Sequence, residues 1–568
     1  MDSIEYARPL SLKAENPFES EIALYSKIRR AQDISVLVCV PDFYHVALPN
    51  LGHQIVEFQI NQLPGFYASR CYLDTNFNLL RESDTPPNIV VISMSYEGSY
   101  IRAIRILDRL GLKPLAEERP VGDPLVIIGG RSVSINPLPL FKIADVIAIG
   151  DSDQLIQSIC QAFQNNRGKS NSFFDAIVQH TGVIVPQRYS VTTSNGYLDH
   201  WEAHNAPTDI YPNRSNFFPH SWYLSSETDY NAIGYYNGKT FFSIEIVKAC
   251  ASKCLFCAEG FNNGSMRFTS DVEVITDKAL WGQRYGADLT KLFFPANSTL
   301  ETTKDILKTM LDRGLFPRVG SAKAEKIDRE YVELVARSNQ EKIAIAPETG
   351  DYILRAQLGK PGMTDEVLYK VVEWIIDAGI PNLDFYFIAN LPGEALESFE
   401  KTVEFIGAFL HFSQRRGLVG RMRISIPNFF PKAWTPFQYA HAGDIEQYLK
   451  KVRLLEETFG GSIAISSMKQ SVDLLSQNIM SRGGIEAGLL LVDVYSKLRT
   501  MELQTHLYHE DTLEDWRESM RRLGIPETQY FSQKASDNPL PWNHIHLYPS
   551  TTRLAKAWHV FSRKRAIL

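Results

Sequence analysis

Short apolar runs alternate with amphipathic segments along most of this chain, and this alternation most constrains how it can fold. Up to residue 151 the apolar runs are rich in Val and Ile, which is typical of strands that are buried on both faces. The segments between them carry apolar residues at the three- and four-residue spacing of helices. This pattern predicts an amino-terminal, Rossmann-like α/β domain with a parallel sheet. The expected strands are 34–40, 88–95, 124–130 and 145–151.

The loops that follow these strands are the expected binding edge of the domain. In an open parallel sheet, ligands bind beyond the carboxyl ends of the strands. The four loops should therefore converge on one ligand; they are 41–52, 93–100, 129–137 and 150–153. The candidate binding residues within them are Asp42, His45, Ser93, Ser95, Gly129, Gly130 and Gly150.

A second series of strands and helices runs from residue 240 to residue 430. Its six strand candidates alternate with helical patterns, several of which stop at a glycine, as helix C-termini often do. Six βα units predict a partial (β/α)6 barrel. The chain is then expected to divide into an α/β domain, a connector, the barrel and a smaller C-terminal cap domain, at 1–155, 156–235, 236–430 and 431–568.

The composition limits the classes of partner that this protein is expected to bind. The chain has 568 residues, a formal net charge of −6 and a pI near 6.2, so it has no general attraction for nucleic acid or anionic lipid. Its start lacks the basic and apolar regions of a signal peptide, and it contains no run of about 18 apolar residues. These features predict a cytoplasmic protein that uses neither a membrane nor nucleic acid as a partner.

The distribution of cysteines is more informative than their number. Only six occur in the whole chain, far fewer than a disulfide-rich scaffold needs, but three fall within eight positions, at Cys250, Cys254 and Cys257. The other three lie in or beside apolar segments, where a free cysteine usually serves as a small buried side chain. The clustered cysteines are therefore the candidates for chemistry.

The cluster, Cys-Ala-Ser-Lys-Cys-Leu-Phe-Cys, directly follows an expected strand. A short loop there could fold three thiolates around one cuboidal iron–sulfur cluster and leave one iron without a cysteine ligand. Such an open iron can bind a substrate. Zinc is the alternative, but it would normally need a fourth Cys or His at a recognisable spacing, and none is evident.

This C-x3-C-x2-C spacing resembles the signature of the radical S-adenosylmethionine superfamily. The resemblance implies a [4Fe–4S] cluster on Cys250, Cys254 and Cys257, with S-adenosylmethionine bound to the open iron. One electron, delivered by a donor such as a flavodoxin or ferredoxin, would then cleave the sulfonium and yield a 5′-deoxyadenosyl radical. Phe256 matches an aromatic residue that the family often has there, near the adenine.

The same resemblance implies roles for three other positions. Glu348, in IAPETG, falls where relatives contact the ribose or methionine part of S-adenosylmethionine, although it could instead cap the next helix. Asn390, in ANLPGE, belongs to a loop that lies near the adenine in relatives. Glu273 could be a fourth cluster ligand, as in relatives that make no free radical, or an ordinary acid near a helix N-terminus.

An α/β domain that precedes such a barrel resembles the cobalamin-binding domain of class B radical methyltransferases. The chain departs from the familiar Asp-x-His-x-x-Gly pattern, because its first loop reads Asp42-Phe-Tyr-His45. Three outcomes follow: cobalamin without a protein ligand, an atypical His45 contact, or no cobalamin. Similarity to the cobalamin-dependent tryptophan 2-C-methyltransferases would place Arg70 beneath cobalt; a surface ion pair is the alternative.

The segment Phe-Pro-Lys-Ala-Trp-Thr-Pro-Phe-Gln, at 430–438, and IAPETG together resemble motifs of a further family of radical S-adenosylmethionine proteins. The proline and aromatic content of 430–438 also suits a rigid turn that closes a barrel.

These resemblances imply an enzyme that moves a methyl group from S-adenosylmethionine through cobalamin to a carbon of a small or peptide-derived substrate. Two other kinds of enzyme remain as alternatives. One is a cyclase or rearrangement enzyme that uses the same cofactors, including cobalamin, and the other is a radical enzyme without cobalamin. A cluster-bearing sensor without enzymatic activity is the alternative from another class.

Overall fold

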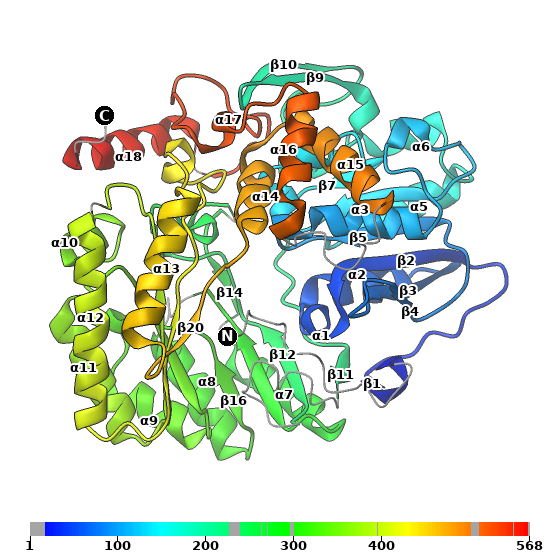
Figure 1. The fold of residues 1–568 in the computed structure, drawn as a ribbon. Coiled ribbons are helices and arrows are strands. Elements are labelled where there is room, and N and C mark those ends of the chain that lie inside the picture. The colour runs from blue at the N-terminus through cyan, green and yellow to red at the C-terminus, as the bar shows by residue number, and fades with distance from the viewer. Residues whose placement is uncertain are drawn as a thin grey trace. The chain divides into compact units, whose positions relative to one another are not determined.

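The computed structural model describes residues 17–225, 239–262, 264–269, 271–295, 300–394, 396–500, 510–548 and 550–565. These residues form two compact units, each made of separate stretches of sequence (Figure 1). The first, called here the sheet unit, comprises the described parts of residues 8–223 and 470–550. The second, called here the barrel unit, comprises the described parts of residues 224–469 and 551–568. The chain passes from one to the other within strand β11 (Tyr223–Ser225).

The sheet unit is built on a seven-stranded sheet with the order β4-β3-β2-β5-β6-β7-β8. Its five inner strands are parallel, and the short strands β4 and β8 pair antiparallel at the two edges. The strands are β2 (Ile34–Phe43), β3 (Phe66–Leu73), β4 (Leu79–Arg81), β5 (Ile89–Ser93), β6 (Leu125–Gly129), β7 (Val146–Ala148) and β8 (Val183–Ile184). Nearly all their apolar side chains are buried, as expected for a sheet that is covered on both faces.

The order of the parallel strands predicts where a ligand crevice lies. Counted along the chain, the five strands have the order 2-1-3-4-5, which is that of flavodoxin-like sheets. The direction of winding reverses between β2 and β5, so the connections after these two strands leave toward opposite faces. Ligands of open α/β sheets bind at this switch point, beyond the carboxyl ends of the strands. In this chain the switch point lies between the ends of β2 and β5, at Phe43 and Ser93.

Helices cover both faces of the sheet. Those from the first part of the unit are α1 (Tyr44–Ala47), α2 (Leu51–Asn61), α3 (Tyr100–Arg109), α4 (Arg131–Ile135), α5 (Leu155–Asn165) and α6 (Asn171–Ile177). Residues of α2, α5 and α6 form one continuous core with alternate residues of β2, β3, β5 and β6. A hairpin of β9 (Tyr189–Ser194) and β10 (Tyr197–Ala203) follows.

The later segment of the sheet unit folds back over the ends of its strands. It contains α14 (Ser471–Arg482), α15 (Ile485–Thr500), α16 (Leu513–Arg522) and α17 (Thr528–Phe531). Tyr96 donates its hydroxyl proton to Gln477 over 2.8 Å, and the Asn136 side chain donates to the carbonyl of Gly483 over 2.9 Å. Two of the expected ligand loops, after β5 and β6, are therefore held by α14.

The barrel unit contains a three-stranded and a four-stranded parallel sheet. A single bridge between Ala322 and Ile345 continues one sheet into the other, which gives the order β12-β15-β16-β17-β18-β19-β20. Among the described residues no ladder joins β20 back to β12, so the barrel is open. The strands are β12 (Phe241–Glu245), β15 (Leu289–Phe293), β16 (Pro317–Val319), β17 (Lys342–Glu348), β18 (Asn382–Phe387), β19 (Met422–Ser425) and β20 (Ala464–Ser466).

Helices pack on the outside of these strands (Figure 1). Phe385 and Phe387 of β18 meet Phe405 and Phe409 of α12 in a cluster of aromatic rings. Several of the helices begin at an Asp or Thr whose side chain accepts a backbone N–H, a cap that contributes about 1 kcal/mol. The helices are α7 (Val272–Arg284), α8 (Leu300–Asp312), α9 (Arg329–Arg337), α10 (Tyr352–Gln357), α11 (Asp365–Asp377), α12 (Leu396–Arg415), α13 (Ile445–Phe459) and α18 (Thr551–Lys564).

The α/β fold class and the strands expected in both series are confirmed. The structure adds β3 and β4 to the first series and β20 to the second. The residues expected to form one C-terminal cap domain, 431–568, are instead shared between the two units. The end of the expected connector, 226–235, lies outside the described residues. In the part of the chain that the structure describes, no helix is long and apolar enough to span a membrane.

The stability of the sheet unit depends on the backbone conformation of Gly130. Its φ of 119° and ψ of −176° are essentially restricted to glycine, and a Cβ there would lie 2.1 Å from the carbonyl oxygen of Met94. Gly130→Ala should therefore destabilise the unit by about 3 kcal/mol or more, seen as a lower thermal unfolding midpoint. Gly111→Ala is the matched control, because a Cβ at Gly111 (φ +76°) meets nothing within 4 Å and should cost only about 1 kcal/mol. Equal effects of the two substitutions would contradict the prediction.

Candidate functional site

The three clustered cysteines lie in a loop that is closed at its base by two short strands. β13 (Val247–Lys248) follows β12 directly, and β14 (Arg267–Phe268) returns antiparallel to it. Between them the chain makes short turns, including the turn Ala258–Gly260 after Cys257. The loop thus starts at the carboxyl end of a barrel strand, where barrel enzymes carry their active sites.

Two other segments of the barrel unit brace this loop through its backbone. The N–H of Leu255 donates to the carbonyl of Leu358 over 3.0 Å, and the carbonyl of Leu255 accepts from the N–H of Phe437 over 3.3 Å. Gly359 makes the first contact possible, because its φ is +104° and a Cβ there would lie 3.1 Å from the carbonyl oxygen of Lys253. Phe437 belongs to the 430–438 segment, which was expected to form a rigid turn. The cysteine loop is therefore held in place from both sides.

The thiols of this loop lie close enough to influence one another. Cys250 and Cys254 are buried, and Cys257 is partly buried. Burial raises the pKa of the Cys254 thiol to about 11, while the neighbouring cations Lys360 and Lys323 act in the opposite direction. Burial also raises the pKa of Cys257, and the nearby Cys250 adds to the effect. Bare thiolates are thus disfavoured here, and a bound metal centre would supply the missing positive charge.

Glu348 and Lys360 form a buried ion pair beside the loop. Glu348 ends β17 with a φ of +67°, an unusual conformation for a side chain of its kind. Lys360 Nζ donates to Glu348 Oε1 and to the carbonyl of Ala346, each over 2.5 Å, and lies 5.9 Å from the ring centroid of Phe256. Burial raises the pKa of Glu348, an effect that Lys360 opposes. The pair brings two expected positions, Glu348 and Phe256, to one side of the cysteine loop.

The three thiols of the cysteine loop are a donor set that a cuboidal cluster can use. Within the described residues, no group of three or more His, Cys, Asp or Glu side chains is placed to hold one metal ion. In a [4Fe–4S] cluster three thiolates bind three separate irons, so their sulfurs need not share one coordination sphere. The three cysteines of this loop could hold such a cluster, with the fourth iron left to another ligand.

Glu273 and Asn390 have other surroundings. Glu273 lies on the first turn of α7 with 64% of its side chain exposed and pairs with Arg313. Its position is that of the helix-surface alternative, away from any burial that a cluster ligand would need. Asn390, at φ +60°, donates to Asn428 and to the carbonyl of Asp444, and accepts from Lys451. These bonds make Asn390 a part of the loop's own framework.

In the sheet unit, two expected ligand loops meet at the switch point. The Asn50 side chain donates to Ser95 Oγ over 2.8 Å, which ties the loop after β2 to the loop after β5. Asp42 pairs with Arg102 over 2.8 Å, and the ring of His45 lies parallel to that of Phe43 at 6.0 Å. Ser93 ends β5 beside them. This is the part of the strand edge where an open sheet binds its ligand.

The loops after β6 and β7 are occupied by the chain itself. Gly129 pairs with Ser93 in the sheet, and Gly130 lies against Met94. Gly150 forms a bridge with Asn213, and a Cβ on Gly150 would lie 2.2 Å from the Asn213 carbonyl oxygen. These glycines permit close approach of backbone to backbone. Of the four loops expected to share one ligand, the first meets the second through Asn50 and Ser95. The second meets the third through Met94 and Gly130, and the third meets the fourth through Ser134 and Gly150.

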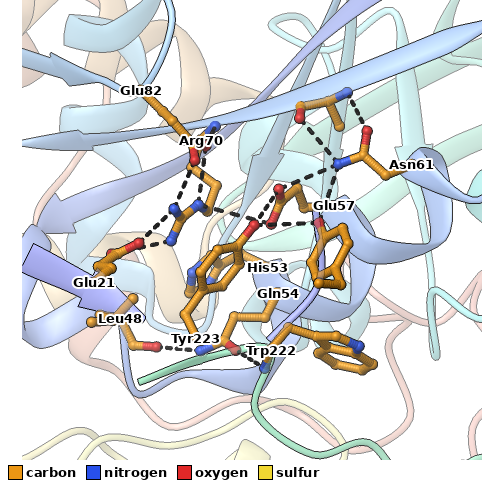
Figure 2. A network of polar contacts seen from close by, with 12 residues as sticks. Glu21, Leu48, His53, Gln54, Glu57, Asn61, Arg70, Glu82, Trp222 and Tyr223 are labelled. Carbon is orange, nitrogen blue, oxygen red and sulfur yellow. Dashed lines mark hydrogen bonds and ion pairs between the residues drawn. The ribbon is translucent and has the colours of Figure 1, made fainter. Parts of the chain in front are cut away.

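Arg70 lies inside the sheet unit (Figure 2). Its side chain is 1% exposed and makes ion pairs with Glu21 over 2.6 Å, Glu82 over 2.9 Å and Glu57 over 3.8 Å. The ring of Tyr223 covers the guanidinium at 3.5 Å from the ring centroid. Arg70 thus matches neither expectation: it is not a surface residue, and its guanidinium is fully engaged by carboxylates of the chain.

Four contributors to these sites were not predicted as site residues. They are Lys323, Gly359, the backbone of Phe437 and the side chain of Asn50. Gly359 had a signal in the sequence, since glycine is the residue that most readily adopts a positive φ. The others act through contacts between segments distant in the sequence, for which one sequence offers no signal.

Two family comparisons now bear on the site. Residues 52–186 match the family model for the N-terminal region of radical SAM proteins, and residues 244–406 match the model for the radical SAM superfamily. Together the two regions span more than half of the chain. The chain belongs to the radical S-adenosylmethionine superfamily. Membership implies a [4Fe–4S] cluster and S-adenosylmethionine as cofactors.

Comparison with individual proteins finds only distant similarities. No curated protein sequence matches the chain. Among solved structures, TsrM of Kitasatospora setae, a radical S-adenosylmethionine methyltransferase with cobalamin and a [4Fe–4S] cluster bound, is 13% identical, with a TM-score of 0.48 over 87% of this chain and 99% of that one. OxsB, a cobalamin-dependent S-adenosylmethionine radical enzyme, is 13% identical, with a TM-score of 0.45 over 94% of this chain and 80% of that one. At TM-scores below 0.5, neither match establishes a shared fold.

Substitution of the clustered cysteines tests the cluster site. Cys250→Ala, Cys254→Ala and Cys257→Ala should each lower the iron content of the anaerobically reconstituted protein from about four per chain to near zero, because two thiolates hold a cluster poorly. Iron and sulfide analysis with the visible absorption spectrum measures this. Cys160→Ala is the control, since Cys160 is buried in the core of the sheet unit. Retention of a full cluster by a Cys254→Ala variant would contradict the assignment.

The Glu348–Lys360 pair makes a separate prediction about stability. Lys360→Met should destabilise the barrel unit by about 3–5 kcal/mol, because it leaves the Glu348 charge buried without its partner. The double variant Lys360→Met/Glu348→Gln should recover most of the loss. Arg329→Met is the control: Arg329 and Glu333 form an exposed pair, whose loss should cost less than about 1 kcal/mol. Thermal unfolding of the reconstituted proteins measures the stability of these three variants. A double variant no more stable than Lys360→Met would contradict the prediction.

Proposed function

We propose that the protein is a cobalamin-dependent radical S-adenosylmethionine enzyme that transfers a methyl group to a carbon of a small or peptide-derived substrate. The observation that carries the proposal is the pairing, in one chain, of a braced three-cysteine loop with a doubly wound sheet whose switch point is lined by polar side chains. The superfamily membership supports the first half of this pairing. The strand order 2-1-3-4-5 supports the second.

In this proposal Cys250, Cys254 and Cys257 hold the cluster, which would supply one electron when it is reduced. Their loop leaves one iron for the amino and carboxylate groups of S-adenosylmethionine. The bracing contacts from Leu358 and Phe437 keep the loop from shifting. Phe256 offers an apolar ring beside the loop for the adenine.

Glu348 and Lys360 are the proposed polar contacts to S-adenosylmethionine. Both charged groups are buried beside the cysteine loop and face each other over 2.5 Å. A substrate that carries both an ammonium and a carboxylate can pair with such groups without adding net charge. Glu273 is not part of this proposal, because it pairs with Arg313 on the surface of α7.

The switch point of the sheet unit is the proposed cobalamin site, and Asp42, His45, Asn50 and Ser95 are its polar residues. Ser95 is exposed and Asp42 is half-buried. We propose that cobalt has no protein ligand there. The departure of the first loop, Asp42-Phe-Tyr-His45, from the Asp-x-His-x-x-Gly pattern supports this view.

Two partners complete the proposal. The cluster needs an external one-electron donor, and a flavodoxin or ferredoxin has the required chemistry. The acceptor of the methyl group is proposed only as a class, a carbon atom in a small molecule or in a residue of a modified peptide.

A radical enzyme without cobalamin is the second candidate. It is favoured by the contact that fills the end of the loop after β7, Gly150 with Asn213. The visible spectrum of protein purified without air from cells supplied with cobalamin distinguishes the two candidates, because a corrinoid absorbs where the cluster alone does not.

Products separate methyl transfer from other chemistry. Protein reconstituted with iron, sulfide and cobalamin should convert S-adenosylmethionine labelled in its methyl group into S-adenosylhomocysteine, and the label should appear on cobalamin. Mass spectrometry measures both. Cys254→Ala should abolish the label transfer. Formation of 5′-deoxyadenosine with no label on cobalamin would contradict the proposal, and an unlabelled product of altered mass would favour cyclisation or rearrangement.

A further inference from the structure

One guanidinium inside the sheet unit is surrounded by three carboxylates. Arg70 Nη1 and Nη2 donate to the two oxygens of Glu21 over 3.2 and 2.6 Å. Its Nε and Nη2 donate to Glu82 over 3.2 and 2.9 Å, and the backbone N–H of Arg70 also donates to Glu82. Glu57 of α2 lies 3.8 Å from Arg70 Nε (Figure 2). The side chains of Arg70, Glu21 and Glu57 are at most 3% exposed.

The charges in this group do not balance. With all three carboxylates ionised, the group would carry two uncompensated negative charges, and burial makes such a state costly. Of the three carboxyl groups, Glu57 interacts most weakly with Arg70. Its Oε2 has no hydrogen-bond donor among the described residues, whereas Glu21 and Glu82 each bind Arg70 through both oxygens. Burial accordingly raises the pKa of Glu57 to about 7, although Arg70 acts to lower it.

The group joins segments that are far apart in the sequence. Glu21 comes from β1 (Glu21–Ala23), Glu57 from α2, Arg70 from β3, and Tyr223 from the start of β11. Tyr223 donates its hydroxyl proton to Glu57 Oε1 over 2.6 Å. One position earlier, the N–H of Trp222 donates to Gln54 and its carbonyl accepts from the N–H of Leu24. The same few side chains therefore hold both β1 and residues 222–223 against α2 and the sheet.

We propose that Arg70, Glu21, Glu57, Glu82 and Tyr223 form a proton-dependent latch, which holds β1 and residues 222–223 on the sheet while the Glu57 carboxyl is protonated and releases them when that proton is lost to solvent. With the proton in place, Glu57 is neutral and Arg70 is shared by two carboxylates. Without it, a third buried negative charge repels Glu21. β1 is three residues long, and its Glu21 side chain bonds to Arg70 and accepts from the Tyr44 hydroxyl.

The other ionisable groups around Glu57 do not replace its role. Those that face the latch are Tyr25, Tyr44, His53, Tyr67 and Tyr72. Burial raises the pKa of each of these tyrosines and lowers that of His53 to about 3, so all five are neutral between pH 6 and 8. Burial also raises the pKa of Glu21, an effect that Arg70 and the Tyr44 hydroxyl oppose. Within the latch, Glu57 is the carboxyl whose pKa, about 7, lies in that range.

The direction of the pH effect follows from proton linkage. The latched state binds the Glu57 proton more tightly than an open state, in which the carboxyl has its ordinary pKa of about 4.5. The latch is therefore most stable at low pH, and its stability falls as the pH rises toward 7. The equilibrium constant for opening should rise about tenfold from pH 6 to pH 8 and change little above pH 8.

Hydrogen exchange on the full, anaerobically prepared protein tests the latch. The exchange protection of residues 21–25, which include the Leu24 amide bonded to Trp222, should fall about tenfold from pH 6 to pH 8 after correction for intrinsic rates. Residues 125–129 of β6 should keep their protection and serve as the internal reference. Unchanged protection of residues 21–25 over this range would overturn the proposal.

Two variants separate Glu57 from other sources of pH dependence. Glu57→Gln keeps a neutral side chain of the same size, so protection of residues 21–25 should no longer vary with pH. Glu82→Gln removes a carboxylate that raises the pKa of Glu57, so the rise in opening should level off at a lower pH and be smaller between pH 6 and pH 8. Glu118→Gln, at an exposed position, should behave as the unsubstituted protein. A pH dependence that survives in Glu57→Gln, or, where that variant does not fold, one that Glu82→Gln leaves unmoved, would overturn the proposal.

Discussion

Parallel pairing of strands is the constraint on which the rest of this structure depends. Each parallel connection must return the chain to the same end of its sheet, so the carboxyl ends of consecutive strands gather the loops that carry chemistry. In the barrel unit this brings the cysteine loop after β12 near Glu348 at the end of β17. In the sheet unit it brings Asn50 to Ser95. Both candidate sites are consequences of strand direction, and the residues between strands only decide what each site can hold.

The cysteine loop shows how a site of this kind gains rigidity without a compact core of its own. Its fold depends on backbone hydrogen bonds to Leu358 and Phe437, and on glycines that let the chains approach. Phe437 is itself fixed from the other side by Phe561 of α18, at a ring distance of 4.7 Å. The position of the thiols therefore depends on packing that reaches the C-terminal helix.

Local patterns in the sequence were sufficient to predict the βα rhythm, the expected strands and the three cysteines, because each depends on residues that are close together in the chain. Glu348 lies near the cysteine loop, and its expected contact with S-adenosylmethionine, like that of Phe256, stays a prediction. Asn390 and Gly150 were predicted as ligand contacts, but the structure gives them partners within the chain. Such partners come from distant segments, which a single sequence does not reveal.

Arg70 illustrates the same limit more sharply. β3 was not predicted, and it carries a buried charged residue, Arg70, which is unusual in an inner strand. The polar residues of α2 would normally mark an exposed face, yet His53, Gln54, Glu57 and Asn61 are all buried. Only the three-dimensional structure supplies the partners that make these positions compatible with burial. Glu57 pairs with Arg70, and the other three bond to Tyr72, Trp222 and Ala68.

The division of the chain into two discontinuous units has a consequence for its synthesis. α15 completes the sheet unit by packing near α3, where Tyr495 donates to Asp108 over 2.8 Å, yet the whole first part of the barrel unit is translated between them. The sheet unit cannot reach its final state until residues up to 548 have left the ribosome, and α18 must then join the barrel last. A truncated chain that ends after residue 469 would expose the apolar faces that α14 and α15 cover. Nascent chains of this protein therefore hold an incomplete sheet unit, which lacks α14 and α15, through most of their translation.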